Sequence, residues 1–180
     1  MTFVYRRIHV SGAAGSGKST VAAALAERWD ALHVDADALM WLPSDPPFAK
    51  RRDPDERDRM FLDAVDGAER WVFSRSLLRW GERLTPLFDL VVYLDLPADV
   101  RLARLEARER ARHGAAIEPG GVLHGSHRSL MTLQSGYESG ETPVANRANA
   151  LAWLAGLACP VIRIEGAPTL EESLAIVERA

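Results

Sequence analysis

Apolar residues along the chain follow two alternating patterns, short continuous runs and longer segments with helical spacing. The short runs predict strands at residues 6–11, 31–35, 71–74, 90–95 and 160–164. The helical spacing predicts helices at residues 17–29, 55–68, 98–113, 127–136, 144–157 and 169–179. Strands that alternate with helices are typical of a parallel sheet covered by helices on both faces. The pattern therefore predicts a five-stranded, doubly wound α/β domain.

Residues 90–95, Leu-Val-Val-Tyr-Leu-Asp, form the clearest strand, because an unbroken apolar run indicates burial on both faces of a parallel sheet. Two connecting segments have a different composition. Residues 43–54 contain four prolines and five charged residues, and residues 114–126 are rich in glycine. Such segments predict irregular chain, and we expect both to move over a bound ligand and exclude water.

Composition narrows the class of protein. The chain has 180 residues, a formal net charge of −3 and one cysteine, Cys159, which excludes an internal disulfide and a zinc site of several cysteines. The acidic balance argues against a general binder of nucleic acid or membrane surfaces. No run approaches the roughly 18 apolar residues of a membrane span, and the N-terminus lacks the features of a signal peptide. We expect one cytoplasmic domain over residues 1–180, and both a monomer and a homodimer stay open.

Residues 12–19, Gly-Ala-Ala-Gly-Ser-Gly-Lys-Ser, match the phosphate-binding pattern G-x-x-x-x-G-K-[ST] between a predicted strand and a predicted helix. Its glycines let successive N–H groups point at one anion, and the start of the helix adds the positive end of its dipole. Lys18 brings a positive charge to the β- and γ-phosphates, and the Ser19 hydroxyl is a ligand for Mg²⁺. The alternative, a glycine-rich turn that binds nothing, does not explain the complete motif. The residues expected to bind the nucleoside triphosphate are Gly12, Ala13, Ala14, Gly15, Ser16, Gly17, Lys18, Ser19 and Thr20.

Three aspartates follow predicted strands, at the edge where open α/β sheets bind ligands. Asp35 and Asp37 are two residues apart, so that one can serve Mg²⁺ while the other binds the acceptor hydroxyl. The alternative is that one of them only caps the next helix. Asp95 ends the strand at 90–95 in the manner of a Walker B aspartate, or else belongs to a turn before the next helix. Asp35 and Asp95 are thus candidate metal ligands, and Asp37 is a candidate for acceptor binding.

Arginines in the predicted helix 98–113 are spaced by three, four and four residues, which places them in one stripe. Beside a phosphate loop, such a stripe can hold phosphoryl oxygens, whereas on its own it would be a solvated face balanced by glutamates. We expect Arg104 and Arg108 to act on the nucleotide, and Arg101 and Arg112 to be solvated or supporting. Arg75 and Arg79, after the strand at 71–74, are candidate contacts for an anionic acceptor.

These features together resemble the nucleoside-monophosphate-kinase-like branch of the P-loop kinases, which includes adenylate, shikimate, gluconate and dephospho-coenzyme A kinases. The run from Asp95 through Leu96-Pro97-Ala98-Asp99 to Arg104 and Arg108 is similar to the strand and lid helix of adenylate kinases. The turn Glu165-Gly166-Ala167-Pro168 is similar to their adenine-side loop, which implies that Gly166 contacts the nucleotide. The resemblance implies a P-loop NTPase fold with strand order 2-3-1-4-5, an acceptor-side segment at 43–68 and a small lid at 108–126.

The acceptor half has a mixed pattern. Adenylate kinases carry an aspartate and a D-G-F-P-R sequence after the third strand, whereas this chain has Ser74-Arg75-Ser76-Leu77-Leu78-Arg79. The element Val34-Asp35-Ala36-Asp37-Ala38-Leu39 instead resembles D-x-D-x-L of shikimate and dephospho-coenzyme A kinases, where acidic residues serve Mg²⁺ and the acceptor hydroxyl. The sequence thus predicts an ATP- and Mg²⁺-dependent phosphotransferase that acts on a nucleoside monophosphate or a small hydroxyl compound. Lys18, Asp37, Arg104 and Arg108 are its predicted catalytic residues. A slow ATPase that acts as a regulatory switch is the alternative.

Overall fold

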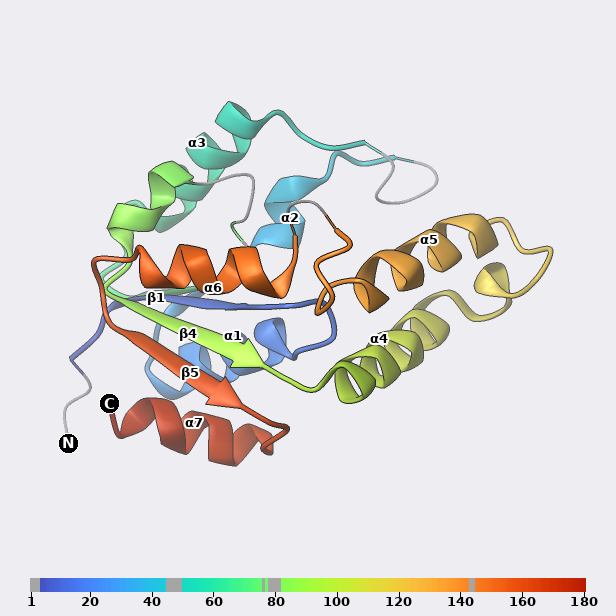
Figure 1. The fold of residues 1–180 in the computed structure, drawn as a ribbon. Coiled ribbons are helices and arrows are strands. Elements are labelled where there is room, and N and C mark those ends of the chain that lie inside the picture. Colours follow the sequence, from blue (N-terminus) through green and yellow to red (C-terminus); the bar gives the residue numbers. More distant parts are fainter. Residues whose placement is uncertain (1–3, 45–49, 76, 78–81, 143–144) are drawn as a thin grey trace.

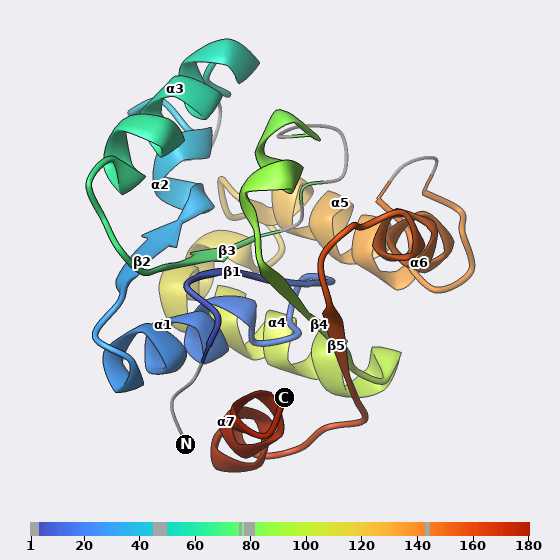
Figure 2. The same cartoon turned by 90° about the vertical axis from the view of Figure 1, so that its left-hand side faces the viewer.

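The computed structural model describes residues 4–44, 50–75, 77, 82–142 and 145–180. Five parallel strands form one sheet in the order β2-β3-β1-β4-β5, as predicted. The strands are β1 (Arg7–Gly12), β2 (Leu32–Asp35), β3 (Trp71–Ser74), β4 (Leu90–Asp95) and β5 (Val161–Glu165). Helices cover both faces of this sheet (Figures 1 and 2). Their bounds are α1 (Lys18–Arg28), α2 (Ala36–Met40), α3 (Pro54–Val65), α4 (Ala98–His113), α5 (His124–Ser135), α6 (Arg147–Ala155) and α7 (Leu170–Glu178).

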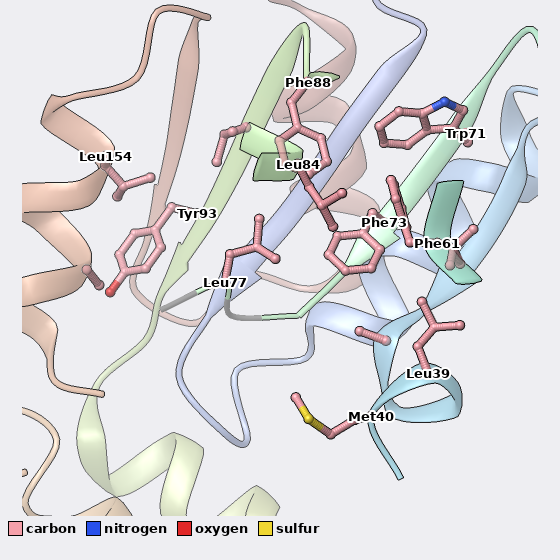
Figure 3. Close-up of a cluster of buried hydrophobic side chains, with 14 residues drawn as sticks. Leu39, Met40, Phe61, Trp71, Phe73, Leu77, Leu84, Phe88, Tyr93 and Leu154 are labelled. Carbon is pink, nitrogen blue, oxygen red and sulfur yellow. The ribbon is translucent and has the colours of Figure 1, made fainter. Parts of the chain in front are cut away.

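Two apolar clusters hold the layers together, one on each face of the sheet. On one face, α1 and α7 pack on the sheet through residues such as Leu25, Leu174 and Val92. On the other face, α2, α3, α6 and the 3₁₀ helix η1 (Glu82–Leu87) bury an aromatic group that includes Phe61 and Phe73 (Figure 3). The side chains of β4 alternate between the two clusters, because a strand covered on both faces must be apolar on both.

Helices α4 and α5, with the 3₁₀ helix η2 (Gly114–Ile117) between them, extend as an arm beyond the carboxyl edge of the sheet (Figure 1). The predicted lid at 108–126 contains the end of α4, all of η2 and the start of α5. The predicted acceptor-side segment at 43–68 contains α3, but its residues 45–49 lie outside the described residues. Within the described part of the chain, no helix is long and apolar enough to cross a membrane.

The structure differs from the predicted elements mainly at helix ends and in short helices. The five-residue helix α2 was not predicted; it begins directly after β2 because the Asp35 side chain accepts a hydrogen bond from the Asp37 N–H and caps it. Helix α6 begins at Arg147 rather than 144, since Asn146 is its N-cap. Helix α7 begins as predicted after Thr169, whose capping box with Glu172 satisfies two backbone donors.

Candidate functional site

The loop between β1 and α1 adopts the backbone conformation that its glycines permit. Gly12, Gly15 and Gly17 have φ values of 147°, 81° and 90°, a region that disfavours other residues. A Cβ at Gly15 would lie 2.0 Å from the Arg101 carbonyl oxygen, so the first turn of α4 packs directly on the loop. Gly17 is the N-cap of α1 and provides no side-chain acceptor, which leaves the first N–H groups of the helix available to an anion.

A cleft of about 490 Å³ opens beside this loop, a size suited to a small-molecule ligand. One wall is the loop and the start of α1, the second is α4, and the third is the turn from β5 into α7. Its apolar lining can accept a planar base, while the loop and α4 contribute the cationic groups. The lining residues are Gly15, Ser16, Gly17, Lys18, Ser19, Thr20, Val21, Asp35, Asp37, Leu94, Leu96, Arg104, Arg108, Arg112, Ile164, Pro168, Thr169, Leu170 and Ser173.

Lys18 is half-buried, and its Nζ donates a hydrogen bond to the Ala13 carbonyl oxygen at 2.7 Å. Burial first, and then the neighbouring charges of Arg75 and Arg108, lower the pKa of this ammonium to about 8. Asp37 acts in the opposite direction. A bound polyphosphate would replace the carbonyl contact with a charge-assisted one, so Lys18 is positioned at the site that the motif predicts.

Asp35 and Asp37 both line the cleft, at the end of β2 and in the first turn of α2. Asp35 Oδ1 accepts the Asp37 N–H at 3.0 Å, so the helix-cap interpretation is right for Asp35, which also reaches the cleft. The Asp37 carboxylate is 60% exposed and forms an ion pair with Arg75. Among the described residues, no three His, Cys, Asp or Glu side chains are grouped to hold a metal. Mg²⁺ needs only one or two carboxylates with hydroxyl, phosphate and water oxygens, and Ser19 and Asp35 on the same cleft fit that requirement.

The arginines of α4 divide into two groups. Arg104, Arg108 and Arg112 line the cleft, and Arg108 also donates to Glu109 at 2.9 Å. Arg101 is different: its side chain is only 1% exposed, and it binds the Glu138 carboxylate and lies over the Tyr137 ring. The expectation that Arg101 is solvated is therefore wrong, whereas a supporting role is consistent with its contacts.

Asp95 does not line the cleft. Arg147 donates to both of its carboxylate oxygens, at 3.1 and 2.7 Å, and Arg163 donates to Oδ2 as well. Burial alone would raise the pKa of Asp95, but these hydrogen bonds lower it below the usual range. Because two guanidinium groups bind the carboxylate, the arrangement favours a structural role over the predicted metal ligand.

A model of the AAA domain matches residues 8–118. The chain belongs to the AAA domain family. An uncharacterized protein of Bacillus subtilis (strain 168), YqaC, is 37% identical over 160 residues, which cover 89% of this chain and 88% of that protein. A cytidylate kinase of Natronomonas pharaonis is 36% identical over 115 residues, 57% of this chain and 58% of the kinase. A gluconokinase from Sinorhizobium meliloti 1021 has the same fold, with a TM-score of 0.56 at 20% identity over 97% of this chain and 90% of its own. The predicted P-loop kinase fold is confirmed.

The AAA domain match includes the loop, both aspartates of the cleft and α4, but it ends before the third wall. That wall contains Pro168, from the turn that resembles the adenine-side loop, and also Thr169, Leu170 and Ser173, which the sequence did not single out as cleft residues. Gly166 lies in the same turn with φ 79°, and its N–H donates to the Asp95 carbonyl oxygen at 3.2 Å; it is not among the lining residues. Arg112 was also missed as a cleft residue, although its spacing of four from Arg108 pointed to the same stripe. Arg79 lies outside the described residues.

Proposed function

We propose that this AAA domain transfers the γ-phosphoryl group of ATP, with Mg²⁺, to a small-molecule acceptor. The observation that carries the proposal is the common cleft of the phosphate loop, the α4 arginines and the Asp35–Asp37 pair. A nucleotide-binding switch requires only the first of these. A carboxylate in the same cleft as the phosphate loop is what an incoming hydroxyl acceptor requires, because it can accept the hydroxyl proton, and the Arg75 guanidinium beside Asp37 would offset its charge toward a phosphate acceptor.

Lys18 and the loop N–H groups would stabilise negative charge on the transferring phosphoryl group, and Arg104 and Arg108 would do so from the opposite wall. Ser19 and Asp35 would hold Mg²⁺, which when bound neutralises phosphate charge. Asp37 would orient the acceptor group, and its ion pair with Arg75 fixes the carboxylate beside Lys18. The protein then contributes position and electrostatics, which supply most of the rate in phosphoryl transfer.

Two segments would complete the site. Residues 108–126 would close over the nucleotide as a lid, and residues 43–68 would contact the acceptor. The resemblance to a protein that bears the name cytidylate kinase makes cytidine monophosphate the first acceptor to examine. Small polyols follow, because the fold is shared with a gluconokinase.

Labelled ATP and Mg²⁺ should be incubated with a panel of nucleoside monophosphates and small polyols, using the native protein and three variants. We expect transfer to one acceptor well above ATP hydrolysis, and a loss of about 10²-fold or more in Lys18→Ala. Arg108→Ala should also lose activity, whereas Arg110→Ala is the matched control, because Arg110 lies on the same helix, pairs with Glu106 and does not line the cleft. Water as the only acceptor would overturn the proposal in favour of the regulatory ATPase.

A further inference from the structure

The histidine at position 9 is fully buried in β1, between the apolar residues Ile8 and Val10. The centroid of its ring lies 5.4 Å from that of Phe73 and 4.8 Å from that of Phe88, two rings of the cluster drawn in Figure 3. Burial lowers its pKa to about 4, and the charge of Lys18 acts in the same direction, so the ring is neutral at neutral pH. Burying the polar ring of His9 costs free energy that burying a phenylalanine would not cost, and the hydrogen bond of the ring offsets part of that cost.

That hydrogen bond goes to Arg75, the first residue after β3. His9 Nε2 lies 2.5 Å from the Arg75 carbonyl oxygen; because a carbonyl only accepts, Nε2 carries the proton. The Arg75 N–H donates to the Val10 carbonyl oxygen at 3.2 Å. The pairing of β1 with β3 ends at Val10 and Ser74, so the sheet itself provides no partner for the Arg75 carbonyl. Two consecutive residues of β1 thus bind both polar groups of the Arg75 backbone.

The Arg75 side chain extends this connection to the cleft. Its guanidinium forms an ion pair with Asp37, whose N–H is bound by Asp35. Lys18 is close enough for Arg75 and Asp37 both to change its pKa, in opposite directions. The Arg75 backbone thus carries the guanidinium that pairs with the Asp37 carboxylate. This pair lies at the edge of the sheet from which the phosphate loop also begins.

We propose that His9 is a positioning residue for the acceptor side of the cleft. Its Nε2–H holds the Arg75 carbonyl, and this keeps the guanidinium on Asp37 and the carboxylate in one orientation. The link from His9 to the Arg75–Asp37 pair stands on the structure alone. Its effect on an acceptor rests on the proposed phosphotransferase function.

The competing explanation is that His9 only fills space, and substitutions at this position separate the two. His9→Phe keeps a ring of similar size and removes the donor. The amide nitrogen of His9→Gln can reach about as far as Nε2, whereas that of His9→Asn ends near Nδ1, too short for the Arg75 carbonyl. Phe88→Leu is the matched control, because it loosens the same aromatic cluster and leaves the hydrogen bond in place.

The first measurement is hydrogen exchange at the Arg75 backbone N–H, which donates to the Val10 carbonyl oxygen, in ¹⁵N-labelled protein, with the signal assigned by its shift in Arg75→Lys. We expect exchange about tenfold faster in His9→Phe and His9→Asn, close to native in His9→Gln, and unchanged in Phe88→Leu. The affinity for ADP should stay within about twofold in all four variants. Unchanged exchange in His9→Phe, or equal exchange in the Gln and Asn variants, overturns the proposal. If His9→Phe does not fold, the Gln and Asn pair decides.

The second measurement uses the acceptor found in the transfer screen. The KM for that acceptor should rise about tenfold in His9→Phe and recover in His9→Gln, while the KM for ATP changes little. An equal rise in both KM values would show a general packing defect and overturn the proposal. If no acceptor supports transfer, the proposed function fails, and the exchange rates alone decide whether His9 positions Arg75.

Discussion

Gly15 is the point at which the phosphate loop and helix α4 meet, and Gly15→Ala tests that contact. The added methyl group would lie 2.0 Å from the Arg101 carbonyl oxygen and 2.9 Å from its carbon, distances that no folded backbone tolerates. Either the loop or the first turn of α4 must move by about 1 Å or more to restore ordinary contact. We therefore expect Gly15→Ala to weaken both the fold and nucleotide binding.

Gly17→Ala provides the matched control for backbone strain. Both glycines have a left-handed φ, 81° and 90°, but a methyl group at Gly17 would meet nothing within 4 Å. Strain costs each variant about 1 kcal/mol, and only Gly15→Ala adds a steric cost of about 2 kcal/mol. For a protein of this size, that difference lowers the Tm of Gly15→Ala by roughly 4–8 °C relative to Gly17→Ala.

Thermal unfolding followed by circular dichroism, without nucleotide, measures this difference directly. Nucleotide is left out because both glycines belong to the binding loop, and each substitution can change ligand stabilisation by itself. Equal Tm values for the two variants would refute the reasoning, since they would show that α4 does not rest on the loop. A Tm for Gly17→Ala below that of Gly15→Ala would refute it more strongly.

Three further predictions concern charge. The negative charge of a bound polyphosphate should raise the pKa of Lys18 from about 8, so that ADP binding at pH 8 takes up about half a proton. Calorimetry in buffers of different ionisation enthalpy measures this proton uptake, which should be absent in Lys18→Arg. The pKa of His9 is about 4 in the folded protein and 6.5 in an unfolded chain, so between these values the unfolded chain binds the extra proton. The free energy of unfolding, measured by urea titration, should therefore fall by about 2 kcal/mol from pH 7 to pH 5, and by less in His9→Gln. Glu138→Ala leaves the charge of Arg101 buried without its carboxylate and should cost about 2 kcal/mol, most of which the added substitution Arg101→Met should restore.

The sequence was sufficient for the fold, and local patterns also located the phosphate loop and the α4 arginines that line the cleft. The loop at 12–19 is continuous in the chain, and the glycine positions, Lys18 and Ser19 are fixed by its geometry. The strand order followed from the family resemblance, and Arg104 and Arg108 were found because a helix brings residues four apart onto one face. The loop and the arginine stripe each required information from fewer than about 20 neighbouring residues, whereas the strand order came from a resemblance that spans nearly the whole chain.

The surroundings of Asp95 and Arg101 could not be predicted in the same way. Asp95 had the position of a metal ligand at a strand end, but its partners Arg147 and Arg163 come from α6 and β5, 52 and 68 residues later. Arg101 belonged to a polar stripe, yet its partner Glu138 is 37 residues away, beyond the end of α5. Whether a charged side chain faces solvent or a buried partner is decided by such long-range packing, which no local pattern contains.

The contacts of Arg101 join the phosphate loop to the arm formed by α4 and α5. Its carbonyl oxygen lies against Gly15 of the phosphate loop, and its side chain binds Glu138, three residues after the end of α5. Both ends of the arm formed by α4 and α5 are therefore fastened at one residue beside the loop, while Arg104, Arg108 and Arg112 follow it along the same helix. A rotation of α4 about this fixed point would move Arg112 farthest and Arg104 least, since displacement grows with distance from a pivot. The arm would then close on the outer part of a bound nucleotide while the contact of α4 with the phosphate loop stays in place.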